Sequence, residues 1–358
     1  MDKKDRTLVI LTPGFPANEA DSTCIPPQQV FVRNLKQLYP TLNIVVLAFE
    51  YPFKFARYQW NGITVISFAG RNVGKLVRMR NWVLVSLALR RLNKKYKLIG
   101  LLSFWMGDCA FVANSFAKKN NLKHFCWILG QDAKRGNKYF RWIKPDPGSL
   151  IALSDFIASE VRCNYSIASA HVIPMGVDPV LFSRSYSERS IDIMGAGSLI
   201  PLKQFHLLIN MVSNLKVYFP GIKAVICGDG PEKELLSMLI KHYQLESNIE
   251  LTGELPHAAV LALMQRTKVF AHLSSYEGLG MVCLEALYAG AEVISLVKPL
   301  NEEIKNWHIA PTNDDAMLIA KKLLTNSAGD SESIAPYLIN NTCKAMMNLF
   351  DYNDAAIF

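Results

Sequence analysis

The segment from Ser274 to Ala286 combines two glutamates with two glycines at the point where a strand pattern gives way to a helical one. Gly278 and Gly280 let the backbone pass close to a ligand, and the free amides at the start of a helix attract an anion. Glu277 lies in the loop and Glu285 about two turns along the helix, so both can face one site. Because carboxylates repel an anion, we expect them to bind hydroxyl groups of a sugar or ribose.

A plainer interpretation is open for each of these side chains. Glu277 fits a solvated loop residue, and Glu285 fits a charge on a helix surface. Residues 282–287 around Glu285 are otherwise apolar, however, and an unpaired charge is costly in such a frame. Lys203 follows a glycine-rich strand end, which favours a binding role, although a solvated position at a helix start is the commoner fate of lysine.

Short apolar runs alternate along the chain with longer stretches of helical period, a pattern typical of βαβ units and parallel sheets. In the first half we expect strands at residues 8–12, 44–48, 63–68, 98–104, 124–129, 150–153 and 171–173, and a helix over residues 26–38 that begins at two prolines. In the second half we expect strands at residues 191–194, 224–227, 249–252, 269–273 and 292–296, and helices from about residues 202, 231, 257, 281 and 314.

Length and composition favour two domains. With 358 residues, 50% of them hydrophobic and 19% charged, the chain exceeds one ordinary core and is too apolar to stay disordered. Residues 173–189 lack periodicity and are predicted as a linker between an N-terminal domain, residues 1–172, and a C-terminal domain, residues 190–338. The predicted fold class is α/β, with two tandem Rossmann-like doubly wound domains that bind ligands where the carboxyl ends of their strands face a cleft.

The same sequence excludes several other classes. The longest apolar runs fall far short of the roughly 20 residues of a membrane span, and no secretory signal opens the chain, so we expect a cytoplasmic protein. Seven cysteines without a C-x-x-C pair are typical of buried thiols in a reducing compartment. His206, His242, His257 and His272 share no ligand spacing, so no metal site is expected.

The net charge of +9 is unevenly distributed. Residues 1–180 carry 25 Lys+Arg against 11 Asp+Glu, a net charge of +14, whereas residues 181–358 carry 14 against 19, a net charge of −5. From Arg71 to Lys97 there are nine Lys or Arg and no acid, with Trp82 and aliphatic residues between them. This pattern predicts a helix that lies on an anionic bilayer, although its apolar centre, residues 82–89, equally suits burial in a core. No motif of a nucleic-acid-binding module occurs, so nucleic acid is not an expected partner.

Five sequence elements together resemble the donor-binding half of the family-4 retaining glycosyltransferases, which are two-domain enzymes of the GT-B fold. They are Glu277 and Glu285 with seven residues between them, Gly195 and Gly197 with Lys203, the turn at residues 228–232, Gly253 after its strand, and residues 173–178 with Phe182. The likeness covers residues 173–296 well and the first half loosely. It implies a GT-B fold in which a last helix, within residues 339–358, packs back on the N-terminal domain.

The resemblance implies a nucleotide diphosphate sugar as the donor substrate and no other cofactor. Lys203 would neutralise the diphosphate, Glu277 would bind hydroxyls of the transferred sugar, and Glu285 would bind the ribose; Glu277 and Lys203 are the predicted catalytic pair. The other residues predicted to contact the donor are Gly14, Gly195, Gly197, Ser198, Gly228, Gly253, Leu255, Gly278, Leu279, Gly280 and Met281. Gly14 equally fits a plain proline turn.

The chain also departs from the family pattern. Ser198 stands where the family usually has a phosphate-binding arginine. Residues 103–108 and 129–132 lack the histidines often found in the N-terminal domain of the family, although Gly130 and Asp132 are kept. No acid or base is therefore assigned to that domain. Transfer does not require one, because in a retaining enzyme of this fold the leaving phosphate is thought to take the acceptor proton, and stabilisation of the diphosphate carries most of the rate effect.

The predicted function is transfer of a hexose-type sugar, with retention, to a lipid-linked or saccharide acceptor in bacterial envelope polysaccharide biosynthesis. The basic stretch adds an anionic membrane surface as a partner, at the inner face of the plasma membrane. Residues 134–144, with five Lys or Arg beside three aromatic residues, either extend that surface or line the acceptor side. Two alternatives stay open: a catalytically weakened GT-B protein that binds nucleotide or a partner enzyme, and a nucleotide-sugar epimerase.

Overall fold

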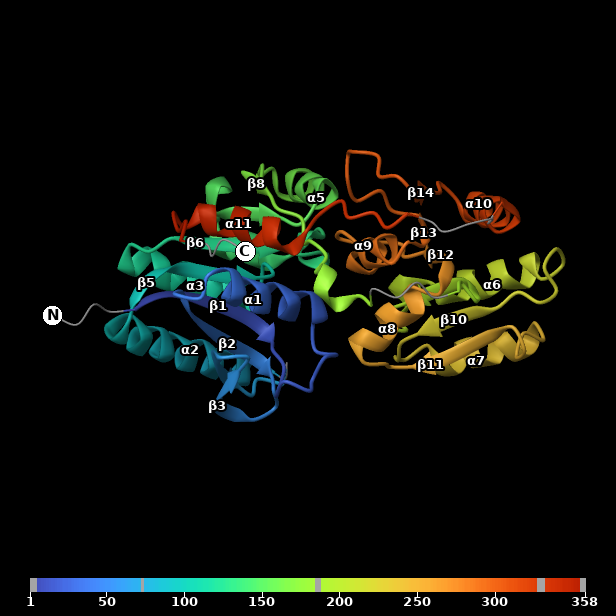
Figure 1. The fold of residues 1–358 in the computed structure, drawn as a ribbon. Helices are drawn as coiled ribbons and strands as arrows, with labels where there is room; N and C mark the ends of the chain where they lie inside the picture. Colours follow the sequence, from blue (N-terminus) through green and yellow to red (C-terminus); the bar gives the residue numbers. More distant parts are fainter. Residues whose placement is uncertain (1–4, 72–73, 184–187, 327–331, 355–358) are drawn as a thin grey trace. The chain divides into compact units, whose positions relative to one another are not determined.

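The computed structural model describes residues 5–71, 74–183, 188–326 and 332–354. The chain divides into two compact units, which we call unit 1 (Met1–Met175 with Ile339–Phe358) and unit 2 (Gly176–Leu338). Each unit contains one sheet covered by helices (Figure 1). The division falls after Met175, within the segment predicted as a linker.

Unit 1 is built on an eight-stranded sheet with the strand order β3-β4-β2-β1-β5-β6-β7-β8. Its strands are β1 Arg6–Gly14, β2 Asn43–Tyr51, β3 Phe55–Trp60, β4 Ile63–Phe68, β5 Lys97–Phe104, β6 His124–Ile128, β7 Leu150–Ala152 and β8 His171–Val172. Its α-helices are α1 Pro26–Leu38, α2 Lys75–Lys95, α3 Asp108–Asn120, α4 Lys138–Ile143, α5 Asp155–Tyr165 and α11 Ile339–Leu349. Among the described strands of this sheet, β3 alone pairs in the antiparallel direction, with β4.

The core of unit 1 explains why its central strands are apolar without alternation. Residues 8–11 of β1 are completely buried, because helices cover both faces of a parallel sheet. Val85 and Leu89 of α2 pack into this core, whereas Val83 and Leu87 of the same helix are exposed. The predicted burial of the apolar centre of this helix is therefore right for one face only.

The last described helix returns to the N-terminal unit, as the resemblance implied. Helix α11 contacts α1 (Figure 1), and the hydroxyl of Thr342 donates a hydrogen bond to the carbonyl of Pro174 at 2.8 Å. Phe350 lies over Gly100 in β5, where a side chain on the glycine would meet the ring at 2.5 Å. The absent side chain thus makes room for this contact.

Unit 2 is built on a six-stranded parallel sheet with the order β11-β10-β9-β12-β13-β14. Its strands are β9 Ile191–Ala196, β10 Ala224–Cys227, β11 Ile249–Gly253, β12 Thr267–His272, β13 Glu292–Ser295 and β14 Trp307–Ile309; its α-helices are α6 Phe205–Leu215, α7 Lys233–His242, α8 His257–Met264, α9 Met281–Tyr288 and α10 Asn313–Asn326. The chain runs outward from β9 in one direction and from β12 in the other. The carboxyl ends of β9 and β12 therefore form a topological switch point, where ligands bind in open α/β sheets.

Two strands and one helix start differ from the sequence-based expectation. Strand β3 alternates between exposed and half-buried residues on the sheet edge, and a hairpin at Asn61 and Gly62, both with positive φ, joins it to β4. Strand β14 has only three residues. The helix expected from residue 202 is divided into a single turn, η4 Pro201–Lys203, and α6, because Gln204 adopts a left-handed conformation with φ 51°.

Candidate functional site

Lys203 and Glu277 meet at the carboxyl end of the unit 2 sheet. Lys203 closes the short helix η4, and the backbone amide of Ser275 donates to the carbonyl of Leu202 at 3.0 Å. This hydrogen bond ties the loop after β12 to η4. As a result, Nζ of Lys203 lies 2.5 Å from Oε2 of Glu277, with the two side chains 19% and 22% exposed. The predicted catalytic pair is brought together at the switch point.

His272 forms a hydrogen bond with Glu277. It is the last residue of β12 and is buried, and its Nε2 lies 2.9 Å from Oε2 of Glu277 and 3.2 Å from the hydroxyl oxygen of Ser274. Burial lowers the pKa of His272, and the charge of Lys203 acts in the same direction. The imidazole is therefore neutral near pH 7, and because an ionised carboxylate can only accept, Nε2 carries the proton that it donates to Glu277.

Glu277 is ionised at any physiological pH. Burial alone would raise its pKa, but the hydrogen bond from His272 and the charge of Lys203 outweigh burial and lower the pKa to about 2. Its second oxygen, Oε1, accepts a hydrogen bond from the amide of Gly278 at 3.2 Å. Glu277 can thus accept hydrogen bonds from a ligand, but it cannot serve as a general acid near neutral pH.

Close approach of two loops explains Gly228. A side chain at Gly228, which has φ +145°, would meet the carbonyl oxygen of Gly197 at 1.9 Å. A Cβ at Gly197 would in turn lie 3.7 Å from Cε of Lys203. Gly195 has a different role, because its absent side chain makes room for Leu208 of α6, at 2.7 Å from a Cβ there. Packing accounts for Gly195 without a ligand.

The segment Gly278–Gly280 leads into α9. Gly280 has φ +72° and precedes Met281, the first residue of the helix. Leu279 is buried, so the loop is anchored to the core. The amides of Cys283 and Leu284 donate to the carbonyl of Gly280 at 2.8 and 3.3 Å. The amides of Met281 and Val282 are therefore the ones in this turn that a ligand at the carboxyl edge of the sheet would use. This arrangement suits an anionic group.

Glu285 forms a second pair with a histidine. It lies on α9 and is 8% exposed, and its Oε1 is 2.8 Å from Nε2 of His257, the first residue of α8. Leu255, half-buried, precedes His257 in the loop that begins at Gly253. The contact places the predicted ribose-binding acid beside the loop that was predicted to border the nucleobase.

Both histidines were considered in the sequence only as metal ligands, so their contacts with Glu277 and Glu285 were missed. Each stands at the boundary of an element on the carboxyl edge of the sheet. A histidine that closes a strand, followed after one leucine by a Ser-Ser-x-Glu loop, is the signal that could have identified His272. Among the described residues, no group of three or more His, Cys, Asp or Glu side chains could hold a metal ion.

Comparison with known proteins decides the family of this region. Residues 183–332 match the family described as Glycosyl transferases group 1. This part of the chain is similar to that family, and we call it the group 1 domain. Its boundaries enclose every element of the site described above.

Curated relatives of the group 1 domain are themselves named glycosyltransferases. The chain is 30% identical over 175 residues to the putative colanic acid biosynthesis glycosyltransferase WcaL of Escherichia coli, covering 45% of this chain and 43% of that one. It is 31% identical over 203 residues to the gpi3 subunit of the phosphatidylinositol N-acetylglucosaminyltransferase of Schizosaccharomyces pombe, covering 55% of this chain and 44% of that protein. The alignments thus span less than half of the length of these relatives.

Solved structures show that the fold is GT-B. Anabaena HepE, in complex with UDP and glucose, has a TM-score of 0.66 at 16% identity, covering 96% of this chain and 95% of that chain. Sucrose-phosphate synthase from Thermosynechococcus elongatus has a TM-score of 0.69 at 16% identity, covering 97% and 95%. Both likenesses extend beyond the group 1 domain into unit 1.

Ser198 and Gly14 are two further residues that were predicted to contact the donor. Ser198 is exposed after β9. Gly14 closes β1 in unit 1, where its φ is not positive and an added Cβ would make ordinary contacts at 3.5 Å. Its geometry therefore does not demand a glycine.

Unit 1 carries a cavity of about 270 Å³ at the carboxyl ends of β1, β2 and β5. The carboxylate of Asp108 forms one wall, accepting hydrogen bonds from the hydroxyl of Tyr139 at 2.6 Å and from Nε1 of Trp82 at 2.7 Å. Nε of Arg78 lies 3.4 Å from its other oxygen. Trp105 also lines the cavity and has φ +62°, a costly conformation for a bulky side chain. The cavity thus combines an aromatic ring with oriented polar groups.

Asp132, retained from the family pattern, is held by backbone amides. Its carboxylate accepts from the amides of Met106 at 2.7 Å, Gly130 at 2.8 Å and Leu129 at 3.2 Å. Burial raises its pKa to about 6, although these hydrogen bonds oppose the rise. The side chain joins the loops after β5 and β6, which is a structural role.

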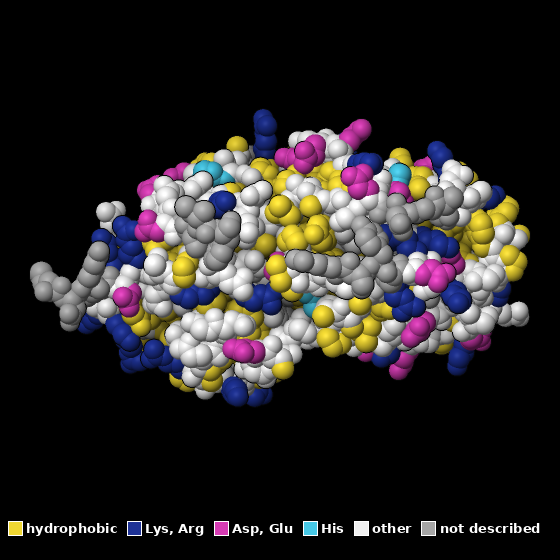
Figure 2. Space-filling model, viewed as in Figure 1, with side chains coloured by type: hydrophobic (Ala, Val, Ile, Leu, Met, Phe, Trp, Pro, Cys, Tyr) yellow, Lys and Arg dark blue, Asp and Glu magenta, His cyan; other side chains and the backbone are white. Residues whose placement is uncertain are grey.

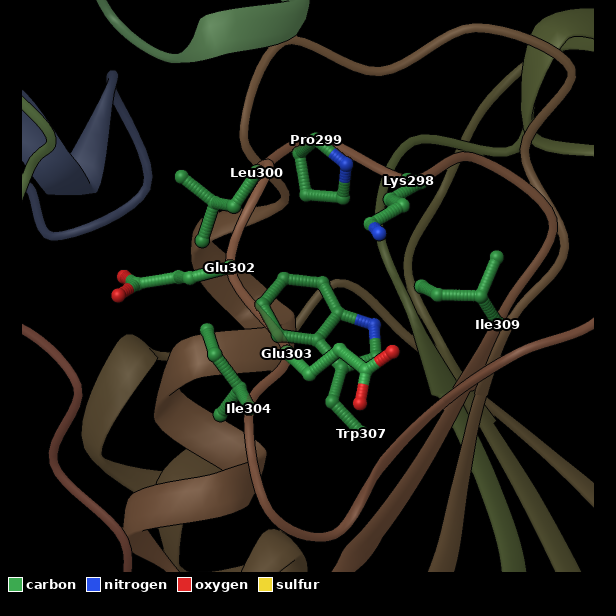
Figure 3. A pocket seen from close by; sticks show the side chains of 8 residues that line it. All are labelled: Lys298, Pro299, Leu300, Glu302, Glu303, Ile304, Trp307 and Ile309. Carbon is green, nitrogen blue, oxygen red and sulfur yellow. The ribbon is translucent and has the colours of Figure 1, made fainter.

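A further cavity of about 290 Å³ follows β13 in the group 1 domain. Figure 3 shows the indole of Trp307 across its floor, with Lys298 and Glu303 beside it and Glu302 pointing away. Nε1 of Trp307 donates to the hydroxyl of Ser295 at 2.9 Å, which fixes the ring. None of the predicted donor contacts lines this cavity.

Proposed function

We propose that this protein is a retaining glycosyltransferase of the family-4 type, which moves a hexose-type sugar from a nucleotide diphosphate sugar to a lipid-linked or saccharide acceptor. The observation that carries the proposal is the contact of Lys203, Glu277 and His272 at the switch point of the unit 2 sheet. The group 1 family match and the complex of HepE with UDP and glucose support a nucleotide-sugar donor.

Each part of the donor finds suitable chemistry in this site. The ammonium of Lys203 and the amides at the start of α9 would bind the diphosphate. They would take over the role of the family's arginine, whose position is occupied by Ser198 in this chain. Glu285, fixed by His257, would accept hydrogen bonds from ribose hydroxyls, and Leu255 would border the base. Glu277 would accept hydrogen bonds from the transferred sugar, and His272 would hold its carboxylate in position.

The chemistry then depends on the leaving group. The bond between the anomeric carbon and the phosphate oxygen breaks, the acceptor hydroxyl oxygen bonds to that carbon on the same face, and the hydroxyl proton passes to the departing phosphate. Lys203 stabilises the charge that develops on the diphosphate. Glu277, ionised with a pKa of about 2, and neutral His272 leave this transfer without a protein acid.

The acceptor is assigned to the cavity of unit 1. Asp108 and Tyr139 would exchange hydrogen bonds with sugar hydroxyls, and Trp105 would stack on a ring face. Lys138, one of the five basic residues within residues 134–144, lines the same cavity and would favour an acceptor with an anionic group. The name of WcaL supports a role in bacterial envelope polysaccharide biosynthesis. We accordingly place the protein in the cytoplasm, at the inner face of the plasma membrane.

The rival function is that of a catalytically weakened GT-B protein that binds nucleotide or a partner enzyme. Ser198 and the missing histidine near Leu129 favour it. An epimerase is a third possibility, which would need no acceptor.

The described residues contain no helix long and apolar enough to cross a membrane.

The deciding experiment has two steps. Thermal-shift screening of the full chain against UDP, GDP and their sugars identifies the donor, because a ligand that binds the folded state raises the melting temperature. The donor is then incubated with candidate acceptors, and NMR of the product reports its anomeric configuration. Acceptor-dependent nucleotide release with retention is expected. Nucleotide binding without release supports the weakened protein, and an altered free nucleotide sugar supports the epimerase.

A further inference from the structure

Helix α2 exposes a row of large apolar side chains. Leu76, Met79, Val83 and Leu87 are 84%, 57%, 59% and 40% exposed. Their spacing of three, four and four residues puts them on one side of the helix, along about 17 Å. Scattered exposed apolar residues are ordinary on a protein surface, but an unbroken row on one helix face marks an interaction site.

The opposite side of α2 is already used by the fold. Asn81, Val85, Leu89 and Leu92 are buried, and the three apolar members of this set belong to the core of unit 1. The helix therefore has two apolar sides, one packed against the sheet and one facing outward. The outward row is not needed for the packing of unit 1.

Every other exposed position of α2 is a cation. These positions are Lys75, Arg80, Arg90, Arg91, Lys94 and Lys95. The exposed surface of the helix thus contains apolar and basic side chains and no acid. Figure 2 shows Lys and Arg side chains gathered, with hydrophobic ones between them, over the region that Figure 1 labels α2.

Exposed aromatic residues adjoin the start of this helix. Phe53 and Phe55 are both exposed, and the guanidinium carbon of Arg71, in the connection to α2, lies 5.9 Å from the centre of the Phe53 ring. Aromatic rings with a neighbouring cation are typical of the interface between lipid and water. The Phe53 ring thus adds exposed aromatic surface beside Arg71, which precedes the helix.

Charge selects among the possible occupants of this face. A second copy of the same face would bring like charges together, which opposes self-association. An anionic bilayer satisfies both components at once, since acyl chains take up the apolar row while lipid phosphates pair with the cations that flank it.

We propose that α2 docks the protein on an anionic phospholipid bilayer, with Leu76, Met79, Val83 and Leu87 inserted below the headgroups. The proposed function places the protein at a membrane, and this proposal names the residues that would bind it. It does not depend on the sugar chemistry, because none of these four side chains lines the cavity of unit 1 or the site of unit 2.

The experiment measures binding of the full chain to vesicles by flotation. Vesicles contain phosphatidylcholine alone or mixed with phosphatidylglycerol. The Leu76→Ser, Val83→Ser double variant should partition at least tenfold more weakly onto the mixed vesicles. The matched control is Val180→Ser, Val217→Ser, which removes two side chains that are 88% and 79% exposed in unit 2, and its partition should be unchanged.

A second pair of variants tests the cations. Arg90→Gln, Arg91→Gln should remove most of the preference for phosphatidylglycerol, whereas Lys118→Gln, Lys119→Gln, exposed on α3, should keep it. Equal binding of the unaltered protein to both vesicles, or full binding of the Leu76 and Val83 variant, would overturn the proposal. So would sedimentation showing a dimer that this variant abolishes while vesicle binding is absent.

Nucleotide binding separates this proposal from the proposed function. Thermal shifts produced by UDP or GDP should be the same in the α2 variants as in the unaltered chain. Loss of vesicle binding with an intact nucleotide shift is the expected result, and it also shows that the variants are folded. An equal loss of the nucleotide shift in the Leu76 and Val83 variant would mean that the face serves the fold, which contradicts docking.

Discussion

Lys203 and Glu277 are 74 residues apart in the chain, yet Nζ and Oε2 lie 2.5 Å from each other. The amide of Ser275, which donates to the carbonyl of Leu202, brings their two loops together. The carboxylate thus neutralises the ammonium. A diphosphate would compete with Glu277 for this ammonium and release the carboxylate toward sugar hydroxyls.

Replacement of Lys203 by alanine should lower kcat by roughly 10² to 10³, because in the proposed mechanism the cation stabilises the charge that develops on the leaving diphosphate. Steady-state kinetics with the donor found by thermal shift measures this loss. Lys305→Ala, which removes a lysine from an exposed ion pair, is the matched control and should leave kcat unchanged. Near-normal turnover of the Lys203→Ala enzyme would contradict the proposed role of this site in binding the donor.

Acid should weaken the stabilising effect of Glu277. Burial opposes ionisation, but His272 and Lys203 lower the pKa of Glu277 from 4.5 to about 2. A lowered pKa in the folded state stabilises the fold above the unfolded value, by roughly 3 kcal/mol at most, and this contribution is lost as pH falls from 4.5 toward 2. The difference in free energy of unfolding between the natural chain and Glu277→Gln should therefore shrink in that window.

Urea unfolding at several pH values measures this difference. Glu234→Gln, at an exposed position of α7, serves as the control and should change stability little at any pH.

His272 also makes the fold less stable in acid, but over a higher pH range than Glu277. Its lowered pKa keeps it neutral in the folded protein, so stability falls as pH drops below the ordinary value of 6.5 and the unfolded chain takes up the proton. A pH-independent difference for Glu277→Gln would contradict the contact with Lys203.

Gly228→Ala should destabilise the protein by roughly 2 kcal/mol or more, because the new Cβ would lie 1.9 Å from the carbonyl oxygen of Gly197 and the backbone has φ +145°. Thermal melting measures the effect. Gly221→Ala is the control, since a Cβ there meets nothing within 4 Å. Equal melting temperatures of the two variants would show that the loops are further apart than described.

Glu285→Ala and His257→Ala should both raise KM for the donor by about tenfold while kcat changes less, because the pair is proposed to bind the ribose, a part of the donor that does not react. Initial rates over a range of donor concentration separate the two constants. His242→Ala, at an exposed position on α7, is the control. If kcat falls and KM does not change, Glu285 acts on the reacting centre instead of the ribose.

The sequence predicted the elements of both sheets more closely than it predicted their edges. Apolar runs identified the central strands, because residues such as Leu8 and Ile193 are buried on a sheet with helices on both faces. Strand β3 escaped notice because it lies on an edge, where Arg57 and Gln59 interrupt the apolar pattern. Its pairing with β4 depends on partners that local composition does not encode.

The sequence by itself determined the residue types of the proposed donor site, because glycines, a lysine and two glutamates at that spacing suit the binding of an anion and of hydroxyl groups. Tertiary structure alone decided that His272 and His257 hold the two acids, since these contacts join residues from different elements. It also decided which side of α2 faces outward. The helix carries apolar residues on more than one side, so its sequence does not show which side is buried. Packing against the sheet selects Val85 and Leu89 for the core and leaves Val83 and Leu87 exposed.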